Sequence, residues 1–249
     1  MALSLVSLNI NWDVQLKTVE PFLRSCNADV VLLQEVLDAD VPKLQEMLGM
    51  DHVHYSTSMR MQTARGLLRE GEAIFSRYPL IDARTLPYAG KAGPDYLYSE
   101  DPSTWDGGYE QRALTGASIT KEGVEYRFFT THFTWTQNGA ATDAQQDDMR
   151  RMLALLAKEE PFVLAGDFNA PRGLATFALL AKQYQDNIPD TYKTSIDISR
   201  HRSGKTQGEH LSKLMVDGLF TSSGFEATNV KLTFGVSDHA AIEALIERV

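Results

Sequence analysis

The sequence predicts an α/β protein in which buried strands alternate with amphipathic helices. The runs VVLL, at 30–33, and FVLA, at 162–165, are continuously apolar, as is typical of strands covered on both faces. Other segments, such as 38–50, carry apolar residues at helical spacing. Because 43% of the 249 residues are hydrophobic and no change in composition marks a linker, we expect one domain, over residues 1–249, with a substantial core.

The first third of the chain is predicted to alternate between strands and helices. Asn9 and Asn11 follow the first strand, and the two-residue period of a strand places them on one face. Asp13 is expected to cap the next helix, and Glu35 follows the second strand. The predicted elements are, in order, a strand over 3–8, a helix from 14 to about 27, a strand over 30–33, a helix over 38–50 and a strand over 71–80.

The rest of the chain is predicted to be richer in strands. Residues 87–111 combine prolines and glycines with aromatic and acidic side chains, and are read either as a functional loop or as a surface excursion anchored by its aromatics. A polar stretch that ends at Lys213 precedes the last strands. The predicted elements are strands over 112–120, 126–133, 162–165, 214–220, 227–234 and 240–246, and helices over 142–159 and 174–182.

The stretch GDFNAP directly follows the apolar run at 162–165. Gly166 permits a close backbone approach, and Asp167 and Asn169, two apart along an extended chain, would point the same way. The alternative is that Asp and Asn before Pro171 only build a turn. The stretch therefore predicts either a pair of polar groups at a strand tip or a turn.

Eight polar side chains share this kind of position, at or near the end of an apolar strand. Burying carboxylates without a partner costs several kcal/mol each, so several that converge imply a bound cation. Oxygen ligands without cysteine favour Mg²⁺ or Mn²⁺ over zinc, and histidines beside such an ion fit metal-assisted hydrolysis of a phosphate ester. The eight residues are Asn9, Glu35, His132, Asp167, Asn169, Asp217, Asp238 and His239.

The net charge and the cysteine content indicate which binding partners and which cellular compartment to expect. The formal net charge of −9 works against broad attraction to duplex DNA, although a local basic patch can override it. Cys26 is the only cysteine, which excludes an internal disulfide and favours a reducing compartment, so we expect a cytoplasmic protein. The amino-terminal residues do not resemble a secretion signal, and no window is apolar enough for a membrane span. We expect a monomer.

Seven sequence blocks together resemble the endonuclease/exonuclease/phosphatase superfamily. That superfamily includes pancreatic deoxyribonuclease, the apurinic/apyrimidinic endonucleases, neutral sphingomyelinases and inositol-polyphosphate 5-phosphatases. The resemblance implies a four-layer α/β/β/α sandwich with two packed mixed β-sheets and a site at one end of it. The blocks, in the order of the family, are SLNIN, VVLLQEV, GEAIFSRYPL, TTHF, LAGDFNAP, VDGLF and GVSDHAAI.

The resemblance assigns the metal site to three residues. Glu35 matches the principal metal ligand of the family, and Asn9 lies beside it in the pattern. Asp238 matches a second acidic residue of the site. One or two Mg²⁺ or Mn²⁺ ions are implied, and the number stays open.

The resemblance also assigns the catalytic residues. Asp167 and Asn169 match the pair that positions the attacking water and the phosphate. His132 matches the histidine that contacts the scissile phosphate or helps the leaving group, and His239 matches the histidine held by an acidic partner, here Asp217. Which histidine acts as the base stays open.

Three departures from the family pattern bear on the site. Asn11 stands where nucleases of the group often have Asp, and Glu72 stands where the block GNAILSRYP has Asn. Met215 and Gly218 replace the arginine and tyrosine of the R-x-D-Y form. None of these changes removes a central catalytic residue.

We therefore expect a metal-dependent phosphodiesterase or phosphatase that acts by attack of water at phosphorus. The alternatives are an endonuclease or exonuclease acting on DNA or RNA, and a non-catalytic binding module on the same fold. The net charge favours a compact phosphoester or a lipid-type head group over long duplex DNA. The candidate substrate-binding residues are Asn11, Glu72, Arg112, Arg200, Arg202 and Lys205.

Overall fold

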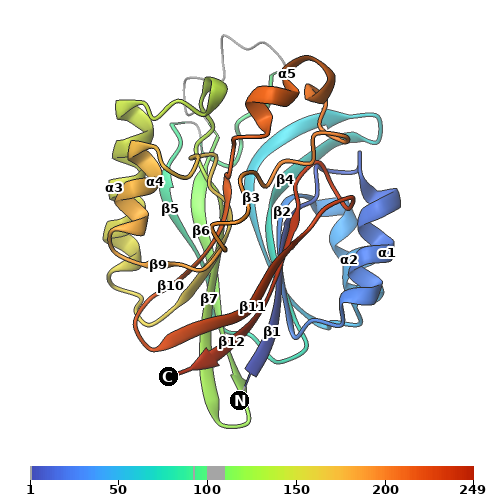
Figure 1. Ribbon diagram of the computed structural model, residues 1–249. Coiled ribbons are helices and arrows are strands. Elements are labelled where there is room, and N and C mark those ends of the chain that lie inside the picture. Colours follow the sequence, from blue (N-terminus) through green and yellow to red (C-terminus); the bar gives the residue numbers. More distant parts are fainter. Residues whose placement is uncertain (1, 92, 100–109) are drawn as a thin grey trace.

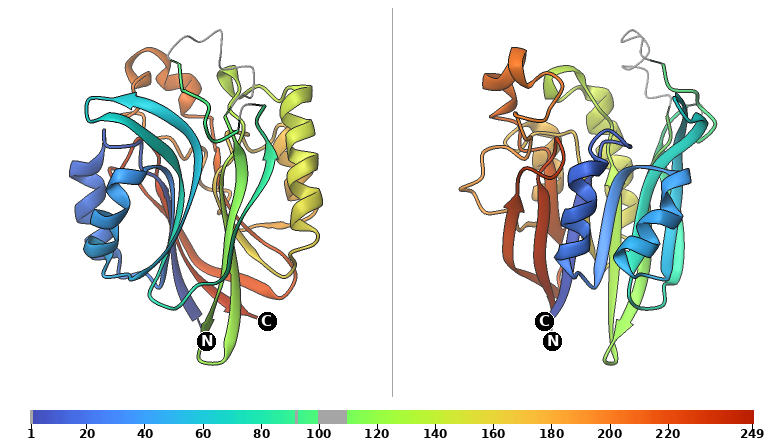
Figure 2. Two further views of the ribbon diagram at one scale, coloured as in Figure 1. Left: turned by 180° about the vertical axis from the view of Figure 1, so that it is seen from behind. Right: turned by 90° about the vertical axis from the view of Figure 1, so that its right-hand side faces the viewer.

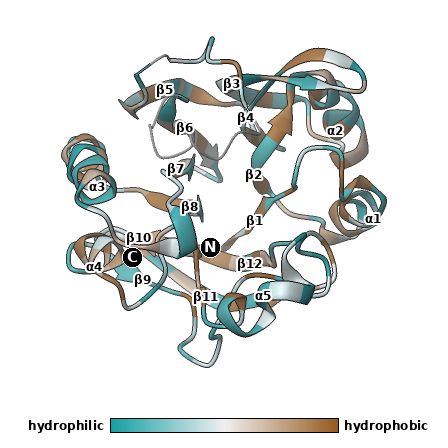
Figure 3. Cartoon of the chain, turned by 90° about the horizontal axis from the view of Figure 1, so that it is seen from above, coloured by the Kyte–Doolittle hydropathy of each residue, from teal (hydrophilic) through white to brown (hydrophobic). Residues whose placement is uncertain are grey.

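Two six-stranded β-sheets pack face to face, and helices cover the outer face of each (Figures 1 and 2). The computed structural model describes residues 2–91, 93–99 and 110–249. Seen from above, α1 and α2 lie outside one sheet, while α3 and α4 lie outside the other (Figure 3). The expected four-layer sandwich with two mixed sheets is confirmed.

The first sheet has the order β11-β12-β1-β2-β4-β3, in which β1 runs parallel to β2 and antiparallel to β12. Its apolar run at 30–33 is continuous because both faces are buried: Leu32 packs between the sheets, whereas Val31 and Leu33 pack under the helices. The strands are β1 (Ala2–Asn9), β2 (Val30–Leu37), β3 (His52–Thr63), β4 (Gly66–Ser76), β11 (Phe225–Thr233) and β12 (Ala241–Arg248).

The second sheet has the order β5-β6-β7-β8-β10-β9, with β7 parallel to β8. The run at 162–165 divides in the same way, since Val163 and Ala165 face the other sheet and Phe162 and Leu164 face the helices. The strands are β5 (Ile81–Ala89), β6 (Arg112–Lys121), β7 (Val124–His132), β8 (Val163–Asp167), β9 (Gln185–Asp186) and β10 (Asp217–Thr221).

Within the described residues, α1 to α4 cover the sheets, and α5 lies at one end of the sandwich (Figure 1). Thr142 caps α3, where its side chain accepts a hydrogen bond from the backbone N–H of Gln145. None of the described helices is long and apolar enough to cross a bilayer. The helices are α1 (Leu16–Cys26), α2 (Val41–Leu48), α3 (Asp143–Leu156), α4 (Ala175–Ala181) and α5 (Gly204–Leu211), with 3-10 turns η1 (Asp38–Asp40) and η3 (Gln137–Gly139).

Several local expectations were wrong. Strands β3 and β5 were missed because their side chains are largely half-buried or exposed, so no apolar run marks them. Helix α5 lies in the stretch expected to be a polar connection, because it buries little beyond Leu211. Asp13 does not cap α1, because the N-cap residue of this helix is Gln15. The carboxylate of Asp13 lies 3.4 Å from Nε of Arg65 instead. Of the loop expected over 87–111, β5 takes the first residues, and residues 92 and 100–109 lie outside the described part.

The ends of the central strands meet at one edge of the sandwich. In the second sheet, Asp167 on β8 is in register with His132 on β7 and with Asp217 on β10. In the first sheet, Asn9 on β1 is in register with Gln34 on β2, next to Glu35. The fold therefore places the polar ends of five strands from two sheets beside one another, at the end where α5 lies (Figure 1).

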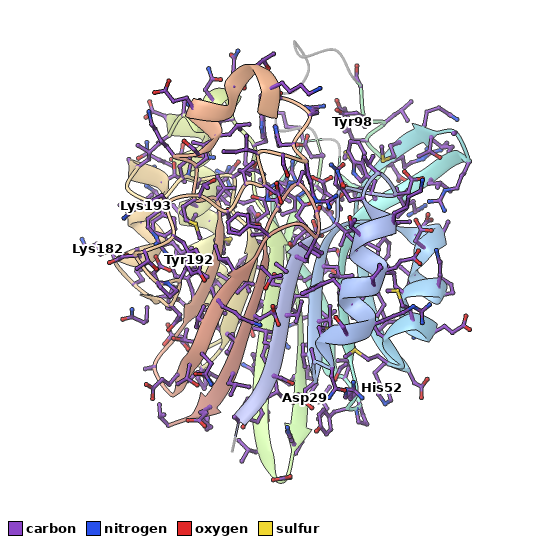
Figure 4. The ribbon with its side chains drawn as sticks, turned by 45° about the vertical axis from the view of Figure 1, so that its right-hand side comes forward. Asp29, His52, Tyr98, Lys182, Tyr192 and Lys193 are labelled. Atoms are coloured by element: carbon purple, nitrogen blue, oxygen red, sulfur yellow. The ribbon has the colours of Figure 1, made fainter. Side chains whose placement is uncertain are left out.

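The opposite end of the sandwich is held by a carboxylate that contacts both sheets. Oδ2 of Asp29, just before β2, accepts hydrogen bonds from the backbone N–H and Oγ of Ser4, each at 2.9 Å. The same oxygen lies 3.0 Å from Nζ of Lys121 at the end of β6. Asp29 is labelled near this end of the sandwich in Figure 4. Burial alone would raise the pKa of Asp29, but these donors outweigh it and lower the pKa.

We predict that Asp29→Asn destabilises the protein by about 1–2 kcal/mol near neutral pH, the usual size for losing a charge-assisted hydrogen bond. A carboxyl whose pKa is lowered by folding stabilises the protein above its unfolded-state pKa, and this stabilisation is lost as the pH falls through the folded-state pKa. Urea unfolding of wild type and variant should therefore converge in acid. Asp51→Asn, at an exposed position, is the control. A difference that persists unchanged at low pH would contradict the electrostatic origin.

Candidate active site

Three neighbouring strands of the second sheet supply the first part of the site. His132, Asp167 and Asp217 lie side by side in register, and Asp167 is 2% exposed. His239 joins them from the loop before β12: its Nδ1 lies 2.8 Å from Oδ2 of Asp217 and its Nε2 lies 3.8 Å from Oδ2 of Asp167. Nε2 of His132 lies 3.6 Å from the same Asp167 oxygen. Both histidines thus point one ring nitrogen towards Asp167.

The first sheet completes the site through an amide that bridges the two sheets. Nδ2 of Asn9 donates to Oε1 of Glu35 at 3.0 Å and to Oδ2 of Asp167 at 3.2 Å. Its Oδ1 accepts from the backbone N–H of Asn11 at 3.0 Å. Asn11 has a left-handed backbone, with φ of 54°, so the strand alternation stops before it and the two asparagines do not share a face as expected.

The backbone of Glu35 is unusual for a residue within a strand. Its φ is 55°, and the pairing of β2 with β4 shifts register between Leu33 and Val36. A left-handed conformation costs a non-glycine residue about 1–2 kcal/mol, and such strain is commonly kept at functional positions. The bulge directs Glu35 to the strand-end cluster.

The GDFN stretch forms a turn and a polar cluster at once. Gly166 has no room for a side chain, since a Cβ would lie 2.3 Å from the carbonyl oxygen of Thr131. Asn169 has φ of 47°, so it does not continue the extended chain; its backbone N–H donates to Oδ1 of Asp167 at 2.9 Å. Its side chain donates to the carbonyl of Phe133 at 3.0 Å. Asp167 uses one oxygen in the turn and leaves the other for the cluster.

Negative charge is not fully compensated in this cluster. Burial, reinforced by the charge of Asp238, raises the pKa of Glu35 to about 7. Burial also raises the pKa of Asp167 to about 6, against the opposing effect of His239. With these values Glu35 is about half protonated at neutral pH and Asp167 is mostly ionised, and a bound cation would favour the ionised form of both.

The pKa values of the two histidines are shifted in opposite directions. Burial, together with the positive charges of Arg112 and His239, holds the pKa of His132 well below its usual range, so His132 is neutral. Burial would also lower the pKa of His239, but the carboxylates of Asp217 and Asp167 outweigh it and raise the pKa well above the usual range. One neutral imidazole and one imidazolium therefore face the same carboxylate.

The donor set fits a hard divalent cation. Asp167, Asp217 and His239 each bring a potential ligand atom within 4.8 Å of the others, and because an imidazolium has no free lone pair, the two carboxylates are the groups of this set that could hold a cation. Glu35 adds a carboxylate whose pKa is raised by burial and, next, by the charge of Asp238. Carboxylate oxygens without thiolates suit Mg²⁺ or Mn²⁺. Asn9 presents its amide nitrogen to the carboxylates, so it would have to turn to offer an oxygen to a metal.

A second acidic pair lies buried beside the site on β4. Glu70 and Glu72 have no exposed surface and point to the same face, two residues apart. Glu72 accepts from Oγ of Ser58 at 2.8 Å, whereas neither carboxylate oxygen of Glu70 has a hydrogen-bond partner among the described residues. Burial raises the pKa of Glu72 to about 7 and that of Glu70 well above its usual value. The sequence analysis missed Glu70, although the alternation in REGE could have revealed it.

Arg112, a candidate for substrate binding, is 5% exposed and is engaged inside the protein. Its Nη1 donates to the backbone carbonyl of His132 at 3.0 Å, and its Nη2 lies 2.5 Å from Oε1 of Glu110. Buried Glu72 is likewise distant from any open surface. We expect both residues to position His132 rather than to contact the substrate.

The candidate residues of the basic stretch precede or belong to α5, at the end of the sandwich where the strand ends meet (Figure 1). Arg202 and Lys205 are exposed, and Arg200 is half-buried, with Nη1 3.4 Å from Oε1 of Gln15 and from Oγ1 of Thr18. The segment that carries them is joined to the loop with Asp238 and His239 by a bridge between Ile196 and His239.

His201 is a further residue near the site that the sequence analysis did not single out. Its Nδ1 accepts from the backbone N–H of Ser203 at 3.1 Å, which leaves the proton of the neutral ring on Nε2. Burial lowers the pKa of His201, while the charge of Asp238 opposes that effect. No local motif marks this residue, because its position depends on the fold of the connecting segment.

Comparisons with known proteins identify the family of the chain and its fold. The model of the Endonuclease/Exonuclease/phosphatase family matches residues 6–239. No curated protein matches the chain.

Solved structures share the fold at low sequence identity. An endonuclease/exonuclease/phosphatase from Beutenbergia cavernae is similar with a TM-score of 0.72 at 16% identity, over 99% of this chain and 72% of that one. A family protein from Leptotrichia buccalis has a TM-score of 0.72 at 19% identity, over 99% and 100% of the chains. A beta toxin variant from Staphylococcus aureus with bound magnesium ions has a TM-score of 0.66 at 17% identity, over 98% and 99%.

We predict that the two histidines titrate at opposite ends of the accessible range in the metal-free protein. NMR titration of the imidazole nitrogens should find His132 neutral and His239 protonated at neutral pH, because His239 is hydrogen-bonded to the carboxylate of Asp217 whereas His132 is buried close to the charge of Arg112. Asp217→Asn should lower the pKa of His239, and any rise in the pKa of His132 as the neighbouring charge of His239 is lost should be smaller, because burial is the main cause of its low value. Similar titration of both rings near the ordinary histidine pKa would refute the assignment.

Proposed function

Because the chain belongs to the Endonuclease/Exonuclease/phosphatase family, we propose that it hydrolyses a phosphate ester by metal-assisted attack of water at phosphorus. The observation that carries the proposal is the contact chain across both sheets. It runs from Glu35 through Asn9 to Asp167, and from Asp167 past His239 to Asp217. A cluster of carboxylates with one charged and one neutral histidine suits displacement at a phosphoryl group.

The proposed metal ligands are Glu35 and Asp238, with Asn9 or Asp167 beside them. The charge of Asp238 is the second largest influence on the pKa of Glu35, which supports their proximity. A bound divalent ion would polarise a phosphoryl oxygen and favour ionisation of water.

Side chains of the protein can accept and donate the protons that the hydrolysis requires. Asp167, whose pKa is raised to about 6, suits acceptance of a proton from water near neutral pH. Its orientation is fixed by the N–H of Asn169. The imidazolium of His239, held by Asp217, can donate to the phosphoryl or leaving oxygen. Neutral His132 can hydrogen-bond the phosphate without repelling a cation.

Long duplex DNA fits the chain less well than a compact phosphoester. Affinity for duplexes rests mainly on neutralising successive phosphates, and a net charge of −9 opposes that. A compact substrate needs only a few cationic side chains, such as those of the basic stretch that leads into α5. We therefore propose a phosphodiester or phosphomonoester of limited size.

The test is turnover of bis(p-nitrophenyl) phosphate and p-nitrophenyl phosphate with and without Mg²⁺, beside a panel of DNA and RNA. Glu35→Gln keeps the shape of the side chain but removes a charge that would hold the cation. We predict a loss of about 100-fold or more, the size expected when one transition-state contact is removed, with partial recovery at raised Mg²⁺.

Glu226→Gln makes the same chemical change at an exposed position of β11 and should have no effect. If wild type turns over equally well after chelation, or if Glu35→Gln retains full activity, the proposed metal site is wrong.

A further inference from the structure

A polar groove opens beside the active site, between η3 and α5. Its volume is about 540 Å³, within the range of small-ligand pockets. Helix α5, which forms one wall of the groove, lies at the end of the sandwich where the strand ends meet (Figure 1). The described residues that line it are Asn138, Thr206, Gln207, Glu209, His210 and Lys213.

The groove adjoins the GDFN turn. A Cβ on Gly139 of η3 would lie 2.6 Å from Cγ of Pro171 and 3.6 Å from Cδ2 of Leu214, so this turn packs directly against the end of the GDFNAP stretch. On the other side of the groove, the segment leading to α5 is joined to the loop before β12, because the backbone N–H of Asp197 donates to the carbonyl of Asp238 at 2.8 Å. Both walls are therefore extensions of segments that carry site residues.

The segment that forms one wall has an unusual charge for this protein. Residues 200–213 contain Arg200, Arg202, Lys205 and Lys213 against the single acid Glu209, a balance of four minus one, or +3. The whole chain has a net charge of −9. Lys213 lies 3.0 Å from Oε1 of Glu209, and both side chains are largely exposed, so this pair contributes little stability and can exchange partners. Cations are thus concentrated at one side of an acidic site.

The lining chemistry distinguishes between kinds of ligand. An acyl chain needs apolar walls, which the described lining residues do not offer, and the imidazole of His210 is the one aromatic ring among them. Asn138, Thr206 and Gln207 offer amides and a hydroxyl, Glu209 accepts, and Lys213 supplies positive charge. This combination matches a polyhydroxylated group that carries an anion.

We propose that the groove is a subsite for a sugar phosphate portion of the substrate, lying beyond the phosphate that is hydrolysed. This inference rests on the proposed function and adds a substrate class to it: a phosphoester whose sugar or polyol carries a second phosphate. Lys213 and the neighbouring Lys205 hold the second phosphate, and the neutral side chains hold the hydroxyls.

Binding tests the subsite without requiring turnover. Isothermal titration calorimetry with Mg²⁺ present compares fructose 1,6-bisphosphate, fructose 6-phosphate and inorganic phosphate, and a 5′-phosphorylated dinucleotide provides the same chemistry from a nucleic-acid end. We expect the bisphosphate or the phosphorylated dinucleotide to bind at least about tenfold more tightly than fructose 6-phosphate, the contribution of one charge-assisted contact. Lys205→Gln/Lys213→Gln should remove that advantage.

Lys182→Gln, which changes a lysine exposed on the outside of the molecule (Figure 4), should preserve the advantage. Equal affinity for all probes, or an advantage unaffected by the double lysine variant, would overturn the subsite. Hydrolysis of bis(p-nitrophenyl) phosphate is measured in parallel. Turnover without a bisphosphate advantage refutes the subsite and leaves the proposed function standing, whereas the advantage without turnover of any ester supports the subsite and refutes the function.

Discussion

The amide of Asn9 is the one contact on which the arrangement of the site depends, because it joins the carboxylates of two separate sheets. Glu35 comes from the first sheet and Asp167 from the second, and Nδ2 of Asn9 lies within 3.2 Å of both. Two like charges that approach in a buried setting repel unless a donor, a proton or a cation lies between them. The rest of the site can be understood as the means of holding these two groups together.

The two ends of the sandwich resolve the same electrostatic problem differently. At one end Asp29 is surrounded by Lys121 and the donors of Ser4, and its pKa is lowered. At the other end burial dominates, and the pKa values of Glu35 and Asp167 are raised. The first arrangement favours folding, whereas the second stores unfavourable charge that a ligand cation can relieve. Such opposition between local stability and chemistry is common at functional sites.

Features that depend only on neighbouring residues in the chain could be predicted from the sequence. The apolar runs at 30–33 and 162–165 predicted buried strands, and the glycine before Asp167 predicted a close backbone approach. The pairing of His239 with Asp217 came from family resemblance, because the two residues are distant in the chain. The left-handed backbone of Glu35, the burial of Arg112 and the groove beside α5 could not be predicted, since each depends on how distant segments pack. Asp167 satisfied both interpretations of its motif, as turn former and as cluster member.

We propose that the carboxylates at the shared edge of the two sheets form a site for a divalent cation. Anomalous diffraction from crystals grown with Mn²⁺ tests it most directly, because Mn²⁺ scatters anomalously and accepts the same oxygen ligands as Mg²⁺. We expect a strong anomalous peak in contact with the carboxylate of Glu35, and its loss in Glu35→Gln crystals. A wild-type structure with the same fold and with Mn²⁺ bound only elsewhere would contradict it.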